Sequence, residues 1–326
     1  MSGHRKNDSA YAGHWTDWSV SVLNGVLGDY LCERDNGLAI EQMFYHRNRP
    51  LATTTESLRA AYPHPTAKLC ILLHGLACNE GVWVFRRTQD EPARCYGTLL
   101  QQELGYTPFF LRYNTGLPIA VNGRRFAGLL EEMLACYPVA VEEIVLLGHS
   151  MGGLVVRSAC HYGTRMKHGW VNKVRHAFYL GTPHDGADLE VLGALATSLL
   201  QTVPHPLTRV IAKVLNRRSR GIKDLRRSDR LCEDAASDDG SATPWIPGAW
   251  HHLFVGTLTD DPQGVASQLF GDGLVRPPRS PARNPAAAEQ AESRRVHVTV
   301  FPGVHHMGLA NDPGVYEHIK LHCMTE

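Results

Sequence analysis

Residues 143–153 read EIVLLGHSMGG, an apolar run followed by the pattern Gly-x-Ser-x-Gly. The run 143–147 has the length and composition of a buried strand, and residues 153–160 carry apolar side chains at helical spacing without a proline. The pattern predicts a strand, a sharp turn and a helix, with Ser150 on the turn. Glycine is expected on both sides of the serine, because a side chain there would collide with the neighbouring backbone.

A serine presented on such a turn is a candidate nucleophile. An alcohol has a high pKa, so it needs a general base to remove its proton and an acid to hold that base in the right tautomer. In proteins with this type of turn, the three residues occur in the order Ser, Asp or Glu, and His. We therefore expect the acid and the base of Ser150 further along the chain, each after a late strand.

Two adjacent histidines follow the last predicted strand, 296–301. Only one of His305 and His306 can face Ser150. We favour His306 as the base, because it opens the His-Met-Gly-Leu stretch that leads to the terminal helix, and His305 stays the alternative. His297 alternates within the strand and is interpreted as a solvent-facing residue.

The favoured acid is Asp272, which lies between two glycines in the segment GDGLV. Asp260 and Asp261 are the alternatives, since they also follow a predicted strand, at 252–255. Adjacent acids before a proline are, however, the composition of a turn initiator. The sequence therefore predicts a triad of Ser150, Asp272 and His306.

The negatively charged oxygen of a tetrahedral intermediate needs two fixed N–H donors, one of which comes from the residue after the nucleophile. That residue is Met151. The second donor is expected in the loop after the first central strand, where His74 and Gly75 precede Leu76. Gly75 allows close approach, and the Leu76 N–H is the predicted donor.

Unbroken apolar runs predict the strands of a mostly parallel sheet, because strands covered on both faces have this composition. Amphipathic helical stretches, clearest at 123–136, alternate with these runs. The fold class is therefore α/β, with helices on both faces of the central sheet. The predicted strands are 68–73, 108–113, 143–147, 176–180, 252–255 and 296–301.

The sequence predicts two divisions of the chain. Residues 1–64 form an N-terminal helical prelude, whose helical spacing extends to Phe44 with a break at 25–28 and which packs outside the core. Residues 65–326 form the second domain, with a helical cap or lid inserted at about 185–250. Helices packed permanently on the sheet are the equal alternative to a mobile lid.

Composition limits the partners of the protein. Lys and Arg number 33 and Asp and Glu 32, so the formal net charge of +1 gives no reason to expect nucleic acid or an anionic membrane. The eight cysteines have no metal-ligand spacing and are interpreted as reduced thiols of a cytoplasmic protein. No segment reaches the roughly 18 uninterrupted apolar residues of a membrane span. We expect no membrane span, no catalytic metal and no cofactor.

Taken together, the motifs resemble those of the α/β-hydrolase superfamily. Within it they are similar to the bacterial serine lipase and esterase group, which includes triacylglycerol lipases and inositol-deacylase-like hydrolases. The resemblance extends over residues 65–326. The motifs that carry it are LHGL at 73–76, GHSMGG at 148–153, LGTPHDG at 180–186, GDGLV at 271–275 and His306.

The resemblance implies the α/β-hydrolase fold and ester hydrolysis through a covalent acyl-enzyme. The substrate would be a small-molecule or lipid ester, and we expect acyl chains of short to medium length. Ser150 is then the nucleophile, His306 the base and then the acid, and Asp272 the residue that orients it. An acyltransferase or a non-catalytic binding protein on the same fold is the alternative. The motif at 180–186 departs from the usual pattern, because Asp185 stands between its histidine and its glycine.

Overall fold

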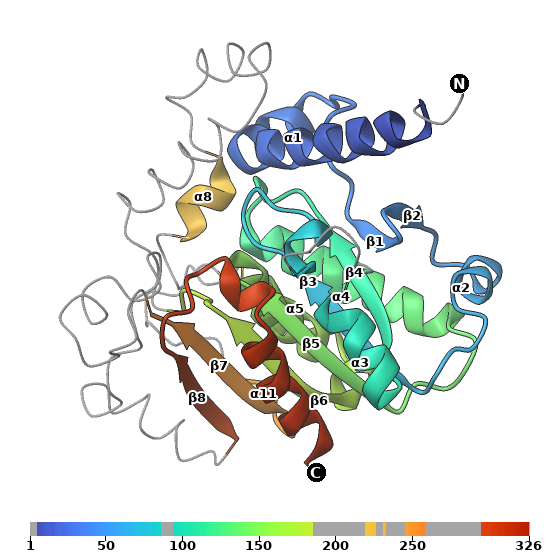
Figure 1. Cartoon of the computed structure of the whole chain (residues 1–326), viewed down its shortest axis with the longest axis vertical. Helices are drawn as coiled ribbons and strands as arrows, with labels where there is room; N and C mark the ends of the chain where they lie inside the picture. The colour runs from blue at the N-terminus through green and yellow to red at the C-terminus, as the bar shows by residue number, and fades with distance from the viewer. Residues whose placement is uncertain are drawn as a thin grey trace.

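An eight-stranded sheet organises the computed structural model of the protein (Figure 1), which describes residues 5–85, 94–184, 219–225, 231–232, 245–257 and 295–325. The strands lie in the order β2-β1-β4-β3-β5-β6-β7-β8. Their bounds are β1 (Met43–His46), β2 (Arg49–Leu51), β3 (Lys68–Leu73), β4 (Thr107–Arg112), β5 (Glu143–His149), β6 (Val174–Leu180), β7 (Trp250–Gly256) and β8 (Val296–Phe301).

The strands β3 to β8 run parallel to one another, and each matches a predicted apolar run. At one edge, β1 pairs antiparallel with β4 and with β2. The predicted α/β class and mostly parallel sheet are therefore confirmed. The strand order reverses between β3 and β5, and in sheets of this kind ligands bind in the crevice at the carboxyl ends of the strands at such a reversal. The motifs after β3 and β5 lie at that position.

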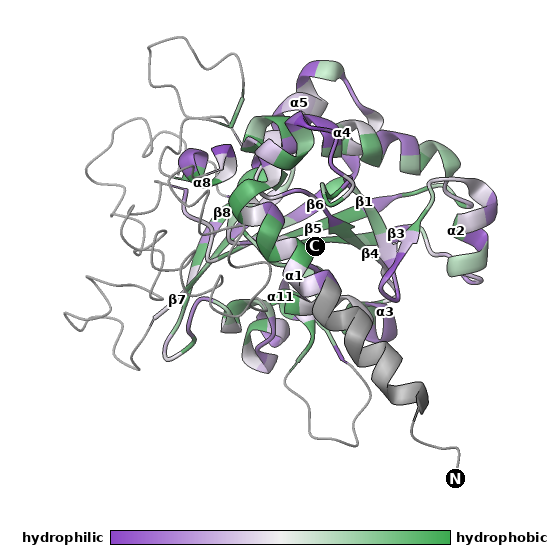
Figure 2. Ribbon diagram, turned by 90° about the horizontal axis from the view of Figure 1, so that it is seen from above, coloured by the Kyte–Doolittle hydropathy of each residue, from purple (hydrophilic) through white to green (hydrophobic). Residues whose placement is uncertain are grey.

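Helices cover both faces of the sheet (Figure 2). The elements α4 and α5 lie on one face, whereas α3 and α11 lie on the other. The described helices are α1 (Arg5–Glu33), α2 (Thr55–Ala61), α3 (Tyr96–Leu104), α4 (Ile119–Cys136), α5 (Met151–Met166), α8 (Arg220–Leu225) and α11 (Pro313–Met324), with short 3-10 turns η1 (Glu80–Trp83), η2 (Gly169–Lys173) and η4 (Gly308–Ala310).

The central strand β3 shows why an unbroken apolar run is needed. Side chains of a strand alternate between its two faces. Leu69 and Ile71 pack in the core that includes α4 and α5, and Cys70 and Leu72 pack in the core that includes α3 and α11. All four are fully buried, and each buried leucine or isoleucine side chain stabilises the fold by roughly 1.5–3 kcal/mol.

The N-terminal helix differs from its prediction. The break predicted at 25–28 is wrong, because α1 is continuous from Arg5 to Glu33. A Cβ at Gly25 would lie 2.6 Å from the Cβ of Ala77, and one at Gly28 would overlap the side chain of Asn114. The glycines are therefore sites of close contact between α1 and the rest of the protein. Each destabilises the helix by about 1 kcal/mol relative to alanine. The buried side chains of α1 belong to the same core as those of α4 and α5. The prediction that this segment packs outside the core is therefore wrong.

The segment from Met43 to Leu51 is a β-hairpin. The predicted helical spacing, which extended to Phe44, is therefore wrong at its end. Its two turn residues, Arg47 and Asn48, have φ values of 49° and 59°, as a tight two-residue hairpin requires. Phe44 is fully buried and packs edge-on against Phe109 of β4, with ring centroids 5.4 Å apart. Pairing with β4 therefore decides the structure of this segment.

Most of the predicted cap or lid at about 185–250 lies outside the described residues. The helix α8 within it packs against the body of the protein: Ile222 and Leu225 are buried in the core shared with α1. The Gly221 N–H donates to the Gly116 carbonyl at 3.0 Å, and the Asp224 carboxylate accepts from the Ile119 N–H at 3.1 Å. This part of the segment is a packed helix. The cap beyond it stays a prediction.

Candidate active site

Ser150 lies on the turn between β5 and α5, as the sequence predicts. Its φ of 53° and ψ of −122° are strained for a residue with a side chain, at a cost of roughly 1–3 kcal/mol. Two hydrogen bonds hold the turn: the Ser150 N–H donates to the Leu180 carbonyl at 2.8 Å, and the Gly153 N–H donates to the Ser150 carbonyl at 3.1 Å. The local geometry is that of a nucleophile elbow.

The glycines around the elbow are required by close backbone packing. A Cβ at Gly148 would lie 2.5 Å from the Cα of Gly153. One at Gly152 would lie 2.6 Å from the carbonyl oxygen of His74 and closer still to that of Leu73. The helix can therefore leave the strand sharply, and β3 can pass directly beside its first turn.

The loop after β3 lies against the elbow. Leu73 pairs with Gly148, and a Cβ at Gly75 would lie 3.0 Å from the Cβ of Ser150. The two predicted N–H donors, Leu76 and Met151, are thus in segments that meet at Ser150. Met151 is the first residue of α5, where backbone N–H groups have no acceptor inside the helix and the helix end carries partial positive charge.

Several contacts hold this loop in place. The Ala77 N–H donates to the Thr115 hydroxyl at 3.0 Å, and the Tyr113 hydroxyl donates to the His74 carbonyl at 2.8 Å. The His74 ring stacks on Tyr113 with centroids 4.6 Å apart, and its Nδ1 donates to the Gly75 carbonyl at 2.9 Å. Burial lowers the pKa of His74 to about 4, so this ring is neutral and acts as support for the loop.

The structure separates the two candidate histidines. His306 is 6% exposed, and its ring centroid lies 5.0 Å from that of His149, the residue before Ser150. His305 is exposed, and its Nδ1 accepts a hydrogen bond from the Gly308 N–H at 2.8 Å, at the start of η4. The structure therefore brings His306 to the elbow and leaves His305 as a turn residue at the surface. His297 is exposed, as interpreted from the sequence.

The predicted acid, Asp272, lies outside the described residues, as do the alternatives Asp260 and Asp261. The residue that orients the histidine stays a prediction. Among the described residues, no group of histidine, cysteine and carboxylate side chains has the geometry to hold a metal ion.

The segment after β6 supports the elbow from the other side. A Cβ at Gly153 would overlap Thr182, so this loop packs on the first turn of α5. The Nη1 of Arg157, one turn further on, donates to Nδ1 of His184 at 3.2 Å, and its guanidinium lies 4.2 Å from the ring centroid of Trp245. Burial, and then the charge of Arg157, hold the pKa of His184 well below its usual value. Sequence reasoning missed Arg157, which has the appearance of an ordinary helix residue.

A second set of histidines lies at the opposite ends of the strands. His176 of β6 pairs with Val145 near the start of β5, and its Nδ1 is 3.1 Å from Nε2 of His252. The ring of His322, on α11, lies 4.1 Å from that of His252. Burial lowers the pKa of His176 to about 4 and that of His252 to about 2. The rings of His176 and His252 are neutral and buried, and neither is in contact with the residues of the elbow named above.

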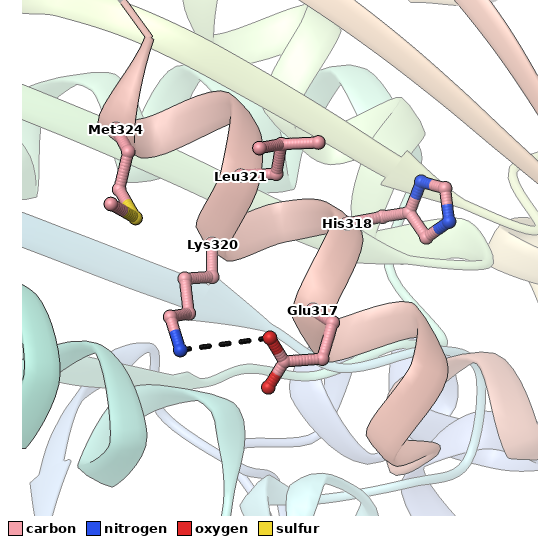
Figure 3. Close-up of a pocket in the computed structure, with 5 residues that line it drawn as sticks. All are labelled: Glu317, His318, Lys320, Leu321 and Met324. Atoms are coloured by element: carbon pink, nitrogen blue, oxygen red, sulfur yellow. Dashed lines mark ion pairs between the residues drawn. The ribbon is translucent and has the colours of Figure 1, made fainter.

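A surface pocket of about 290 Å³ lies on α11 (Figure 3). Lys320 faces Glu317 at 3.6 Å in this pocket and pairs with Glu103 of α3 at 2.7 Å. No predicted site residue lines it, so it is not the candidate active site. Its lining residues are Glu317, His318, Lys320, Leu321 and Met324.

A family model described as PGAP1-like alpha/beta domain matches residues 128–209, which include the elbow and β6. This match agrees with the parallel sheet and with the strand, strained turn and helix around Ser150. The chain has the α/β-hydrolase fold. The predicted resemblance to α/β-hydrolases is thereby confirmed. Within the described part of the chain, no helix has both the length and the hydropathy needed to cross a membrane.

Solved structures similar to the chain include a Bacillus licheniformis lipase in mature form, with 19% identity and a TM-score of 0.49, over 79% of this chain and 94% of that one. A Pyrococcus furiosus esterase has 12% identity and a TM-score of 0.46, over 79% and 80%. A Paleococcus ferrophilus monoacylglycerol lipase has 15% identity and a TM-score of 0.42, over 79% and 93%. No curated protein sequence matches the chain. The chemistry of this protein is therefore inferred from its own residues.

Proposed function

We propose that this α/β-hydrolase is a carboxylic ester hydrolase whose nucleophile is Ser150. The observation that carries the proposal is the strained elbow at Ser150, with the Gly75 loop against one side of it and His306 buried beside the adjoining His149. Strain of this kind persists where function needs it. In this reading, His306 is the general base and Asp272 orients it.

The reaction proceeds in two halves. Ser150 Oγ attacks the ester carbonyl carbon while His306 takes the hydroxyl proton, and the N–H groups of Leu76 and Met151 stabilise the negatively charged oxygen. The intermediate collapses, and His306 gives its proton to the leaving alcohol. Water then attacks the acyl carbon while His306 takes its proton. The bond to Ser150 Oγ breaks as His306 returns that proton to the serine oxygen, and the carboxylic acid leaves.

The substrate class is inferred from charge. The chain has a formal charge of +1, so it has no bulk charge that would favour a strongly charged substrate. A neutral ester agrees with this balance. We propose esters with acyl chains of short to medium length, from a small molecule or a lipid.

Hydrolysis of p-nitrophenyl butyrate and octanoate tests the proposal. Wild-type protein is expected to release p-nitrophenol, and Ser150→Ala is expected to lower kcat by about 10⁴–10⁶-fold. A fluorophosphonate probe should label wild-type protein at Ser150 and leave the variant unlabelled. Equal activity of the two proteins, or labelling at another residue, would overturn the proposal.

A further inference from the structure

His149 contacts three separate parts of the proposed site. It immediately precedes Ser150, and its Nε2 lies 3.0 Å from the carbonyl oxygen of His306. Its Nδ1 lies 3.1 Å from the position that a Cβ on Gly75 would take. The His149 side chain therefore touches the elbow, the loop of the second N–H donor and the segment that carries the proposed base.

The bond to His306 fixes the protonation of the ring. A carbonyl oxygen only accepts hydrogen bonds, so the Nε2 of His149 carries the proton and donates it. The ring is 1% exposed, with the edge of Trp83 at 6.4 Å between centroids. It is therefore enclosed, and its direction is set by contacts on several sides.

The segment 302–307 connects β8 to η4 without being part of a strand or a helix. A general base must stay within hydrogen-bond reach of the nucleophile, and a displacement of 1 Å lowers rates by about 100-fold. We propose that His149 is a positioning residue for the general base: its Nε2–H holds the His306 carbonyl and so fixes that backbone against the elbow. The identity of the base rests on the proposed function.

The substitutions His149→Gln and His149→Asn form a matched pair. The amide nitrogen of glutamine reaches the position of the histidine Nε2, whereas that of asparagine reaches only the position of Nδ1. His149→Asn is expected to lower kcat by about 10–100-fold with KM within about threefold, because only the positioning is lost. His149→Gln is expected to recover kcat to within about fivefold of the wild type. The exposed His64, changed to Asn, is the control for a histidine outside the site.

An equal loss of kcat in both variants would show that the ring only fills space, and unchanged kcat in His149→Asn would show that it is not needed. Either result overturns the proposal. Thermal unfolding of each variant checks that differences in kcat do not reflect differences in folded fraction.

A measurement on the wild-type protein tests the bond without any assay of activity. Nitrogen NMR of histidine-labelled protein reports which ring nitrogen carries the proton, and the His149 signals are assigned by their loss in His149→Gln. The expected tautomer has the proton on Nε2. A proton on Nδ1 alone overturns the proposal. If wild-type protein hydrolyses no ester, the proposed function fails while the tautomer still decides whether the bond to His306 exists.

Discussion

The N–H of Ser150 donates to the carbonyl of Leu180 at 2.8 Å, so the elbow is bonded to the end of the neighbouring strand β6. On the other side of β5, Gly152 packs against the backbone of Leu73 at the end of β3. Ser150, the proposed nucleophile, is thus held by both flanking strands, and changes at either contact reach it directly.

Gly152→Ala is expected to destabilise and inactivate the protein. The added Cβ would lie 2.6 Å from the carbonyl oxygen of His74, which belongs to backbone that cannot move without disturbing the loop after β3. We expect a loss of roughly 2–4 kcal/mol in the free energy of unfolding, measured by chemical denaturation, and at least a tenfold loss of kcat. In the control, Gly128→Ala of α4, the Cβ meets no atom within 4 Å, so stability should rise by up to about 1 kcal/mol. Similar stabilities of the two variants would contradict this account of the elbow.

The two adjacent histidines are expected to respond differently to removal. His306→Ala should lower kcat by about 10⁴-fold or more, because Ser150 would lose its proposed base. His305→Ala should stay within about threefold of the wild type, because His305 is exposed and bonds to the Gly308 N–H. Steady-state ester hydrolysis measures both. A severe loss in His305→Ala with little loss in His306→Ala would reassign the base.

Gly25→Val is expected to lower activity through the loop that carries the Leu76 donor. A Cβ at Gly25 lies 2.6 Å from the Cβ of Ala77, so a larger side chain pushes that loop away from the elbow. The predicted result is a kcat loss of about 10–100-fold, with a smaller change in KM. Gly37→Val is the control, because a Cβ at Gly37 meets no atom within 4 Å. Equal kcat values for the two variants would show that α1 does not position this loop.

Acid is expected to destabilise the protein through its buried histidines. Burial lowers the pKa of His176 to about 4 and that of His252 to about 2, against about 6.5 in the unfolded chain. Below about pH 6.5 the unfolded state then binds more protons than the folded state. The stability that these neutral histidines contribute is therefore fully present above that pH and is lost as the pH falls. Between pH 7 and 4.5, the free energy of unfolding should fall by a few kcal/mol, roughly 1–3 for each such histidine.

Substitution of one histidine isolates this effect. His252→Phe removes one titrating ring from a stack with Phe178, whose centroid lies 4.5 Å away, and should flatten the pH dependence. His64→Phe, at an exposed position, should leave the slope unchanged. Urea denaturation across the pH range provides the free energies. If the free energy of unfolding changes with pH equally in both variants and in the wild type, His252 does not contribute to the acid sensitivity.

The sheet was predictable because its strands are buried on both faces. Every residue of such a strand meets a core, as Cys70 and Ile71 do on opposite faces, so the apolar run itself is the signal. The edge hairpin lacks that signal, and its turn uses Arg47 at positive φ, a position where glycine or asparagine is the recognisable residue. The glycines of α1 were misleading for a related reason. A glycine that ends a helix and one that admits a neighbouring chain look the same in sequence.

The elbow and its loop were predictable because their glycines and spacing follow from local sterics. The choice of His306 over His305 agrees with the burial of one ring and the exposure of the other. The contact of His149 with the His306 carbonyl joins residues 157 positions apart and depends on the packing of two loops. No local pattern encodes such a contact, because His149 occupies a position of the Gly-x-Ser-x-Gly pattern that any residue can fill.

The contacts of α1 also set an order of events during synthesis. The helix is made before its partners at α8: the hydroxyl of Ser219, which donates to the carbonyl of Gly25 at 2.7 Å, lies 194 positions later. At ribosomal speeds of about 5–20 residues per second, roughly 10–40 s separate the two. Val22, Leu23 and Val26 are buried in a core that also contains Ile222 and Leu225 of α8, so part of that core is not yet made during this interval. A nascent chain of this protein therefore carries α1 with part of its apolar cover still missing during that interval, and chaperones that bind apolar helices have a target there.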